Sequence, residues 1–126
     1  MPFKPSNIQE FENVLRKKRV VLALYYKEGE RYSLYVRELA ESLKSNIEPS
    51  IPILLVDVNR LGEVRDKYGV TTVPRLQLFL DGNVVWEQLG VLGTISADKE
   101  AIRFGIRESL KRQGYSLKEL GIRVYF

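Results

Sequence analysis

The sequence predicts one α/β domain built on a mixed four-stranded sheet with helices on both faces. Continuous apolar runs at residues 20–26 and 53–58 are typical of strands that are covered on both sides. A helical apolar pattern lies between them, so these two strands should be parallel. The Asp81-Gly82 pair between two β-rich runs predicts a hairpin, which makes the other half of the sheet antiparallel.

The first element expected is a helix. Ser6 or Asn7 can cap it, and Gln9 and Glu10 stand where a reciprocal capping side chain is usually found. Its apolar residues fall on one face, and the basic run at residues 16–19 follows where the helix dipole favours positive charge.

The middle of the chain should add a helix from about Tyr32 to Ser45, since apolar residues recur there at helical spacing and prolines follow. A short helix capped by Asn59 comes after the second strand. The hairpin strands are expected at residues 75–80 and 83–89.

A long helix capped by Ser96 completes the domain, with Gly114 beyond its end. We therefore expect one domain over residues 1–113 and a short C-terminal extension over residues 114–126. In the extension, Ser116 and Glu119 predict a capped turn, and residues 122–126 read as a short strand with an aromatic end. That strand could pack on its own domain or pair with a second subunit in a homodimer.

The amino-acid composition excludes several kinds of catalytic and metal site. The 126 residues include no cysteine and no histidine, which excludes thiol nucleophiles, Ser-His pairs and ordinary zinc sites, so no cofactor or metal is expected. The net charge of +4 is that of an ordinary soluble protein. No apolar stretch approaches the roughly 20 residues of a membrane span, and the start lacks a signal-peptide pattern, so we expect a cytoplasmic protein without a membrane partner. The low Asn, Gln and Met content is compatible with a thermophilic source.

Residues 57–90 carry a family resemblance. A strand ends in Asp57, a short helix runs into residues 67–70, and Val73-Pro74 precedes the hairpin and Gly90. This order resembles the thioredoxin family, and the similarity extends over residues 19–110. It implies a thioredoxin-like fold. In that family the proline at the Pro74 position is cis, and the residue before it offers backbone hydrogen bonds to a bound substrate strand.

The departures from the family lie in the first half of the chain. The resemblance aligns Gly29 and Tyr32 with the two cysteines of the redox motif, and Ala23 with a buried acidic residue that assists proton transfer. Dithiol-disulfide exchange is therefore excluded. Loss of all three residues, with Val73-Pro74 retained, favours a non-catalytic domain that binds a protein or peptide, or itself.

The leading candidate site is the former active-site surface. A helix start and the residue before a proline both offer backbone groups, and Tyr and Arg are common in binding hot spots. An extended peptide could bind there. The alternative is a solvated loop with a proline kept for folding. The predicted surface consists of Gly29, Glu30, Arg31 and Tyr32, facing Val73, Pro74 and Arg75.

Three other functional hypotheses remain open. A thiol-free glutathione-transferase-like enzyme would use Tyr32 or Ser33, although the chain lacks the helical second domain of such transferases. Four tyrosines near the first strand could line a small-molecule pocket or simply pack. A basic stripe on the last helix could contact phosphates, but acidic residues are interspersed and nucleic acid is not the favoured partner. The stripe is Lys99, Arg103, Arg107 and Lys111, and the tyrosines are Tyr25, Tyr26, Tyr32 and Tyr35.

Overall fold

The computed structural model describes residues 3–47 and 50–123. Within them the order is helix, strand, helix, strand, helix, strand, strand, helix, as the sequence predicts. The elements are α1 (Ile8–Lys17), β1 (Val20–Tyr26), α2 (Ser33–Ile47), β2 (Ile53–Asp57), α3 (Gly62–Lys67), β3 (Arg75–Leu80), β4 (Asn83–Leu89) and α4 (Ile95–Arg112).

The four strands form one mixed sheet in the order β2-β1-β3-β4. β1 is parallel to β2 and antiparallel to β3, and β3 is antiparallel to β4. Asp81 and Gly82 turn the hairpin with φ of 50° and 84°, the left-handed conformation expected of an Asp-Gly turn. The predicted fold class is therefore confirmed.

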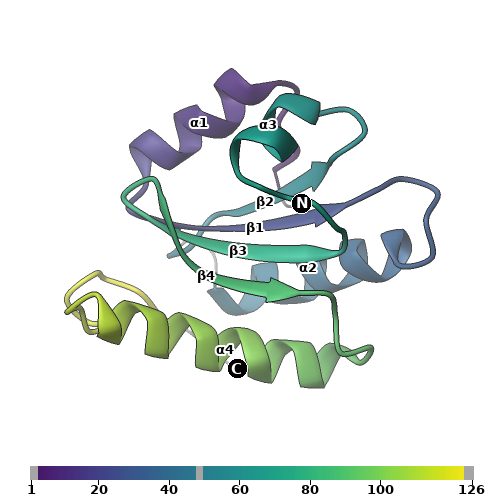
Figure 1. The fold of residues 1–126 in the computed structure, drawn as a ribbon. Coiled ribbons are helices and arrows are strands. Elements are labelled where there is room, and N and C mark those ends of the chain that lie inside the picture. Colours follow the sequence, from purple (N-terminus) through teal and green to yellow (C-terminus); the bar gives the residue numbers. More distant parts are fainter. Residues whose placement is uncertain (1–2, 48–49, 124–126) are drawn as a thin grey trace.

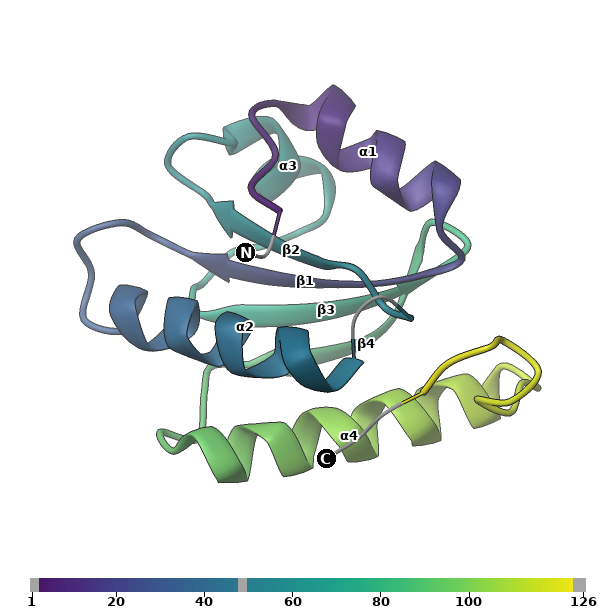
Figure 2. The ribbon, with the colours of Figure 1, turned by 180° about the vertical axis from the view of Figure 1, so that it is seen from behind.

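The helices cover both faces of this sheet (Figures 1 and 2). Leu22 and Leu24 of β1 point to the core under α2 and α4, whereas Val21 and Ala23 point to the core under α1 and α3. Both faces of β1 are thus buried, which explains why its sequence is continuously apolar and does not alternate. No helix in residues 3–47 or 50–123 is both long and apolar enough to cross a membrane.

The start of α1 agrees with the sequence prediction, whereas the starts of α3 and α4 differ from it. Asn7 caps α1, since its side chain accepts a 2.9 Å hydrogen bond from the Glu10 amide. Asn59 does not cap α3, which begins later, after Leu61. Thr94 caps α4 in place of Ser96, because Ile95 already packs against the core and draws the helix start two residues earlier.

The chain after α4 folds back onto the domain. The predicted capped turn is present, with the Glu119 amide donating to Ser116 Oγ and the Ser116 amide donating to Glu119 Oε1. Ile122 is buried, but neither it nor Arg123 is part of a strand; the rest of the predicted strand, residues 124–126, lies outside the described residues. Arg123 instead donates its amide to Ser50 Oγ.

Candidate functional site

The loop before β3 meets the loop between β1 and α2. The Val73–Pro74 peptide bond is cis. A small hollow between the two loops is lined by Glu30, Tyr32 and Ser33 on one side and by Val73 and Pro74 on the other. It adjoins a shallow cleft of about 690 Å³ that also includes Glu30 and Val73. Four of the seven predicted site residues therefore come together, and Tyr32 and Ser33 of the transferase alternative lie there too; that alternative stays a prediction.

Gly29 and Arg31 belong to the same loop but do not line the hollow. Both are exposed. Gly29 has φ of 84°, a conformation that favours glycine, and thereby turns the chain after β1. The Arg31 guanidinium lies 5.4 Å from the centre of the Tyr32 ring, so the Arg31 side chain supports the exposed tyrosine.

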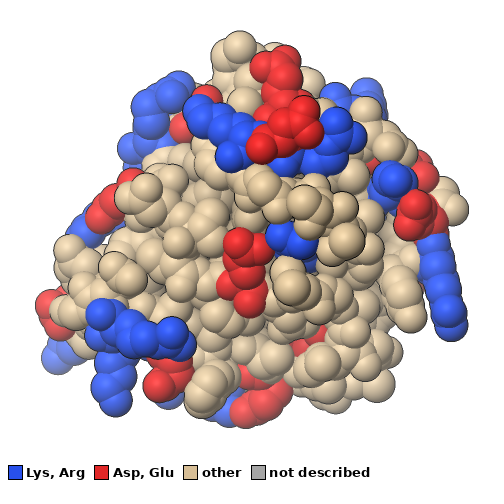
Figure 3. Space-filling model, viewed as in Figure 1, with Lys and Arg blue, Asp and Glu red and all other residues tan. Residues whose placement is uncertain are grey.

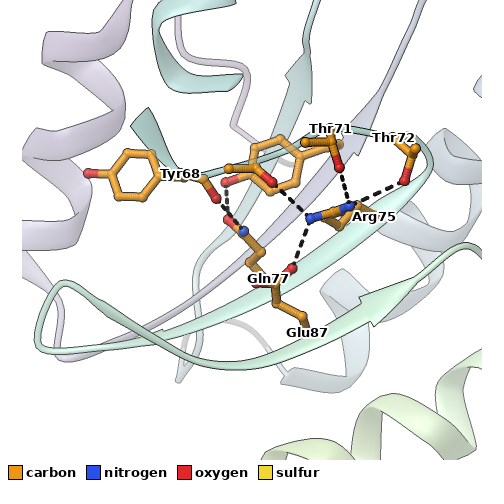
Figure 4. A network of polar contacts seen from close by, with 8 residues as sticks. Tyr68, Thr71, Thr72, Arg75, Gln77 and Glu87 are labelled. Atoms are coloured by element: carbon orange, nitrogen blue, oxygen red, sulfur yellow. Dashed lines mark hydrogen bonds and ion pairs between the residues drawn. The ribbon is translucent and has the colours of Figure 1, made fainter. Parts of the chain in front are cut away.

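Arg75 lies differently from what the sequence analysis anticipated. Its side chain is buried on the α1/α3 side of the sheet and does not join the surface. The guanidinium donates to the Gly69 carbonyl at 2.9 Å and to Glu87 at 3.1 Å. It also donates to the hydroxyls of Thr71 and Thr72 (Figure 4). Side chains alternate between the two faces of a strand, and that of Arg75 lies on the α1/α3 face. Through these hydrogen bonds Arg75 holds the segment that leads into Pro74.

The hydrogen-bonded network continues inward from Arg75. The Tyr25 hydroxyl donates to Gln77 Oε1 at 2.7 Å, and Gln77 Nε2 donates to the Tyr68 carbonyl at 3.0 Å (Figure 4). Burial raises the pKa of Tyr25 far above its ordinary value, so the hydroxyl stays a neutral donor. The end of α3 and the start of β3 are thus connected by buried polar contacts, which fix the backbone that presents Val73.

Asp98 braces the other side of the surface. It is fully buried in the first turn of α4. Its carboxylate accepts hydrogen bonds from the Tyr35 hydroxyl at 2.5 Å, Gln88 Nε2 at 2.9 Å and the Leu92 amide at 2.9 Å. These donors belong to α2, β4 and the loop after β4. Asp98 therefore ties the start of α4 to α2, which is distant in sequence, and to the end of β4 and the loop that follows it. In the sequence, Asp98 is recognisable only as an acidic residue in the first turn of a helix, where the helix dipole favours negative charge.

The segments around Pro74 carry exposed apolar side chains. Within the described residues six large hydrophobic side chains are exposed: Phe3, Tyr32, Leu34, Leu89, Leu92 and Phe104. Leu89 lies opposite Arg75 in the sheet, and the Gly90 amide donates to the Pro74 carbonyl. Leu92 and α2 are joined through Asp98, as described above. Four of the six exposed side chains thus come from the segments that surround Pro74, and we name Tyr32, Leu34, Leu89 and Leu92 the apolar rim.

Three rim residues are not among the site residues that the sequence predicts. Leu34 was detectable, because it falls off the helical face formed by Val36, Leu39 and Leu43. Leu89 and Leu92 carry no such signal, since the end of a strand and a glycine-flanked loop have no periodicity that separates buried from exposed positions.

The backbone of Val73 is available for pairing. No hydrogen bond within the described residues uses its amide N–H or its carbonyl. Buried backbone groups are nearly always paired, so unpaired ones are expected to contact water or a partner. Val73 is only partly buried and borders the hollow. It therefore offers a donor and an acceptor beside Pro74 and Tyr32.

The residues of the basic stripe and the four tyrosines do not form a common site. Lys99 donates to Ser42, and Arg103 pairs with Glu100, so two residues of the basic stripe are engaged within the fold, while Arg107 and Lys111 are exposed. The four tyrosines do not share one pocket: Tyr25 and Tyr26 are buried, Tyr35 bonds Asp98, and Tyr32 is exposed. Burial and the bond to Asp98 raise the pKa of the Tyr35 hydroxyl.

Comparison with known proteins identifies the fold. No protein-family model and no curated protein matches the chain. Among solved structures, a mutant thioredoxin from Halobacterium salinarum is 28% identical with a TM-score of 0.70, over 82% of this chain and 89% of that one. The oxidised thioredoxin of Plasmodium falciparum is 20% identical with a TM-score of 0.73, over 83% and 99%. Mitochondrial thioredoxin 3 of Saccharomyces cerevisiae is 19% identical with a TM-score of 0.68, over 81% and 93%.

Proposed function

We propose that this chain, which has the thioredoxin fold and no cysteine, is a non-catalytic domain that binds an extended segment of a partner protein at the surface around Pro74. Without a thiol the fold cannot carry out thioredoxin-type exchange. The surface around Pro74 keeps unpaired backbone groups and exposed apolar side chains, which a partner can contact. The observation that carries the proposal is the unpaired Val73 backbone beside Pro74, among segments that carry four exposed apolar side chains.

The partner's main chain would pair with Val73. An extended peptide that adds to exposed backbone groups gains affinity from main-chain hydrogen bonds and specificity from its side chains. Glu30 and Tyr32 line the hollow beside Val73 and Pro74, where one partner side chain can enter. Gly29 and Arg31 shape the same loop. Arg75 acts here as a positioning residue, since it holds residues 69–72 and makes no contact with the surface.

The partner's apolar side chains would cover the rim. Tyr32, Leu34, Leu89 and Leu92 are between 40% and 70% exposed. Apolar side chains that cluster on one surface are typical of an interaction site, whereas single exposed ones are ordinary. We therefore expect an extended segment with apolar residues and few charges.

Selection of peptides from a displayed random library provides the test. The affinity of a selected peptide is measured for the wild type and for two single variants, Leu89→Asp and Tyr32→Ala. Each should weaken binding by roughly tenfold, because each removes an anchor next to Val73.

Phe104→Asp is the matched control, since Phe104 is 66% exposed but lies on α4 outside the rim. Its affinity should equal that of the wild type. The proposal fails if the Phe104 variant loses as much affinity as the Leu89 variant, or if the selected peptides bind all four proteins equally.

A further inference from the structure

The opposite end of the sheet carries most of the net charge. A cleft of about 430 Å³ lies between the end of α1, the end of α3 and the β3–β4 turn. Five of its lining residues are basic and two are acidic, a net charge of +3 against +4 for the whole chain. The basic residues are Arg16, Lys17, Lys18, Arg19 and Lys67.

This cleft is distinct from the surface around Pro74. β1 begins at the end of the sheet where α1 ends and the β3–β4 turn lies, and it ends at the loop that leads into α2 (Figure 1). Its seven residues span roughly 20 Å. Basic side chains project at the upper left of Figure 3, over α1. The two sites can therefore be occupied and mutated independently.

Both acidic residues of the cleft are already paired. Asp81 accepts from Arg19 at 3.0 Å and 2.9 Å, and this contact lowers the pKa of the Asp81 carboxyl. Glu12 pairs with Lys67 and accepts from the Tyr68 hydroxyl at 2.6 Å; the bond to Lys67 lowers the pKa of Glu12 most. The acids thus stay ionised and neutralise Arg19 and Lys67, while the other three cations are left over.

Arg16, Lys17 and Lys18 have no ion pair or side-chain hydrogen bond within the described residues. The dipole of α1 favours cations in its last turn, which accounts for Arg16 and Lys17. It does not account for convergence with Arg19, which precedes β1, and Lys67, which belongs to α3. Like charges brought into one cleft repel each other, so an anion that enters it is attracted by all of them.

The neighbouring aromatic ring limits the kind of anion. Tyr68 lines the cleft, but its ring packs against Phe11 at 5.3 Å and Phe79 at 5.4 Å between ring centres, and its hydroxyl is bonded to Glu12. A nucleic-acid base would need a free aromatic face for stacking. The cleft volume is that of a small-molecule site.

We propose that this cleft binds a small anion carrying two or more phosphate groups, held by Arg16, Lys17 and Lys18. Phosphate oxygens accept charge-assisted hydrogen bonds from both arginine and lysine. Several linked phosphates carry enough negative charge to balance three cations, which a single carboxylate does not. This site is independent of the function proposed for the Pro74 surface.

Calorimetric titration with tripolyphosphate tests the proposal. The wild type is compared with the triple variant Arg16→Gln, Lys17→Gln, Lys18→Gln. A control variant carries Lys4→Gln, Arg60→Gln and Lys118→Gln, three exposed cations that do not line the cleft, and so has the same net charge. The cleft variant should bind roughly tenfold or more weakly, the control should bind as the wild type does, and added salt should weaken wild-type binding.

Three outcomes would overturn it: no binding by the wild type at low salt, an equal loss of affinity in both triple variants, or unchanged affinity in the cleft variant. A short oligothymidylate is titrated in parallel. If it binds more tightly than tripolyphosphate and the cleft variant loses both, the small-ligand assignment fails and the cleft is a nucleic-acid surface.

Discussion

Asp98 and Arg75 brace the Pro74 surface from opposite faces of the sheet, and they are stabilised in different ways. Asp98 is fully buried, has no cationic partner within the described residues and is satisfied by neutral donors from three segments. Arg75 has an ion pair with Glu87, which is 37% exposed, and further acceptors in an exposed loop. Water can replace the partners of Arg75 more easily than those of Asp98. We infer that Asp98 contributes more than Arg75 to the free energy of unfolding.

The largest expected effect follows removal of Asp98. Asp98→Ala leaves the Tyr35 hydroxyl, Gln88 amide and Leu92 amide without their acceptor, and should lower the free energy of unfolding by about 3–5 kcal/mol. Chemical denaturation monitored by circular dichroism measures this. Glu100→Ala, in the same helix turn but exposed, is the control and should change the free energy of unfolding by under about 0.5 kcal/mol. Equal effects of the two variants would contradict the role given to Asp98.

Arg75→Ala should be less costly, at about 1–3 kcal/mol, because Glu87, Thr71 and Thr72 can be hydrated once the guanidinium is gone. Arg75→Lys keeps the positive charge but lacks the planar set of guanidinium donors, so it should recover only part of the lost free energy of unfolding. The same denaturation assay gives both values. If Arg75→Ala destabilises the protein more than Asp98→Ala does, the conclusion that Asp98 contributes more to stability is wrong.

The packing of α4 on β4 gives a third, smaller effect on the Asp98 side. A Cβ atom at Gly105 would lie 2.3 Å from the Trp86 ring. Gly105→Ala should therefore destabilise the protein by about 1–2 kcal/mol, since overpacking outweighs the better helix propensity of alanine. Trp86 is the only tryptophan, so its fluorescence reports the change directly. Adding Trp86→Phe should relieve part of the clash, and an Ala variant as stable as the wild type would contradict this packing.

The smallest effect is expected at the exposed Arg19–Asp81 pair. The pKa of Asp81 is lowered in the folded state, so its contribution is present above its unfolded pKa of about 3.9 and is lost as pH falls through the folded value. Both side chains are about half exposed, so the contribution at neutral pH is small. Wild type and Asp81→Asn should differ slightly at pH 7 and converge in acid. A difference that grows on acidification would contradict the sign.

The sequence predicts the strands, the hairpin and the cap at Asn7 because each depends on neighbouring residues. Asp81-Gly82 specifies its own turn, and the apolar run of β1 reports burial on both faces. The Asp98 contacts could not be predicted in this way, since Tyr35 is 63 residues away and no local pattern connects them. The sequence located the loop and Pro74 but not the inward course of Arg75, because arginine side chains are mostly exposed in folded proteins.

We propose that the Val73 backbone pairs with the main chain of a bound partner segment. Hydrogen exchange of the Val73 amide, measured by NMR with and without a peptide selected on the wild type, tests it most directly. We predict slow exchange only in the complex, with protection rising by roughly tenfold or more. If the peptide binds and the Val73 amide still exchanges at the rate of the free protein, the partner does not pair with Val73 and the proposed binding mode is wrong.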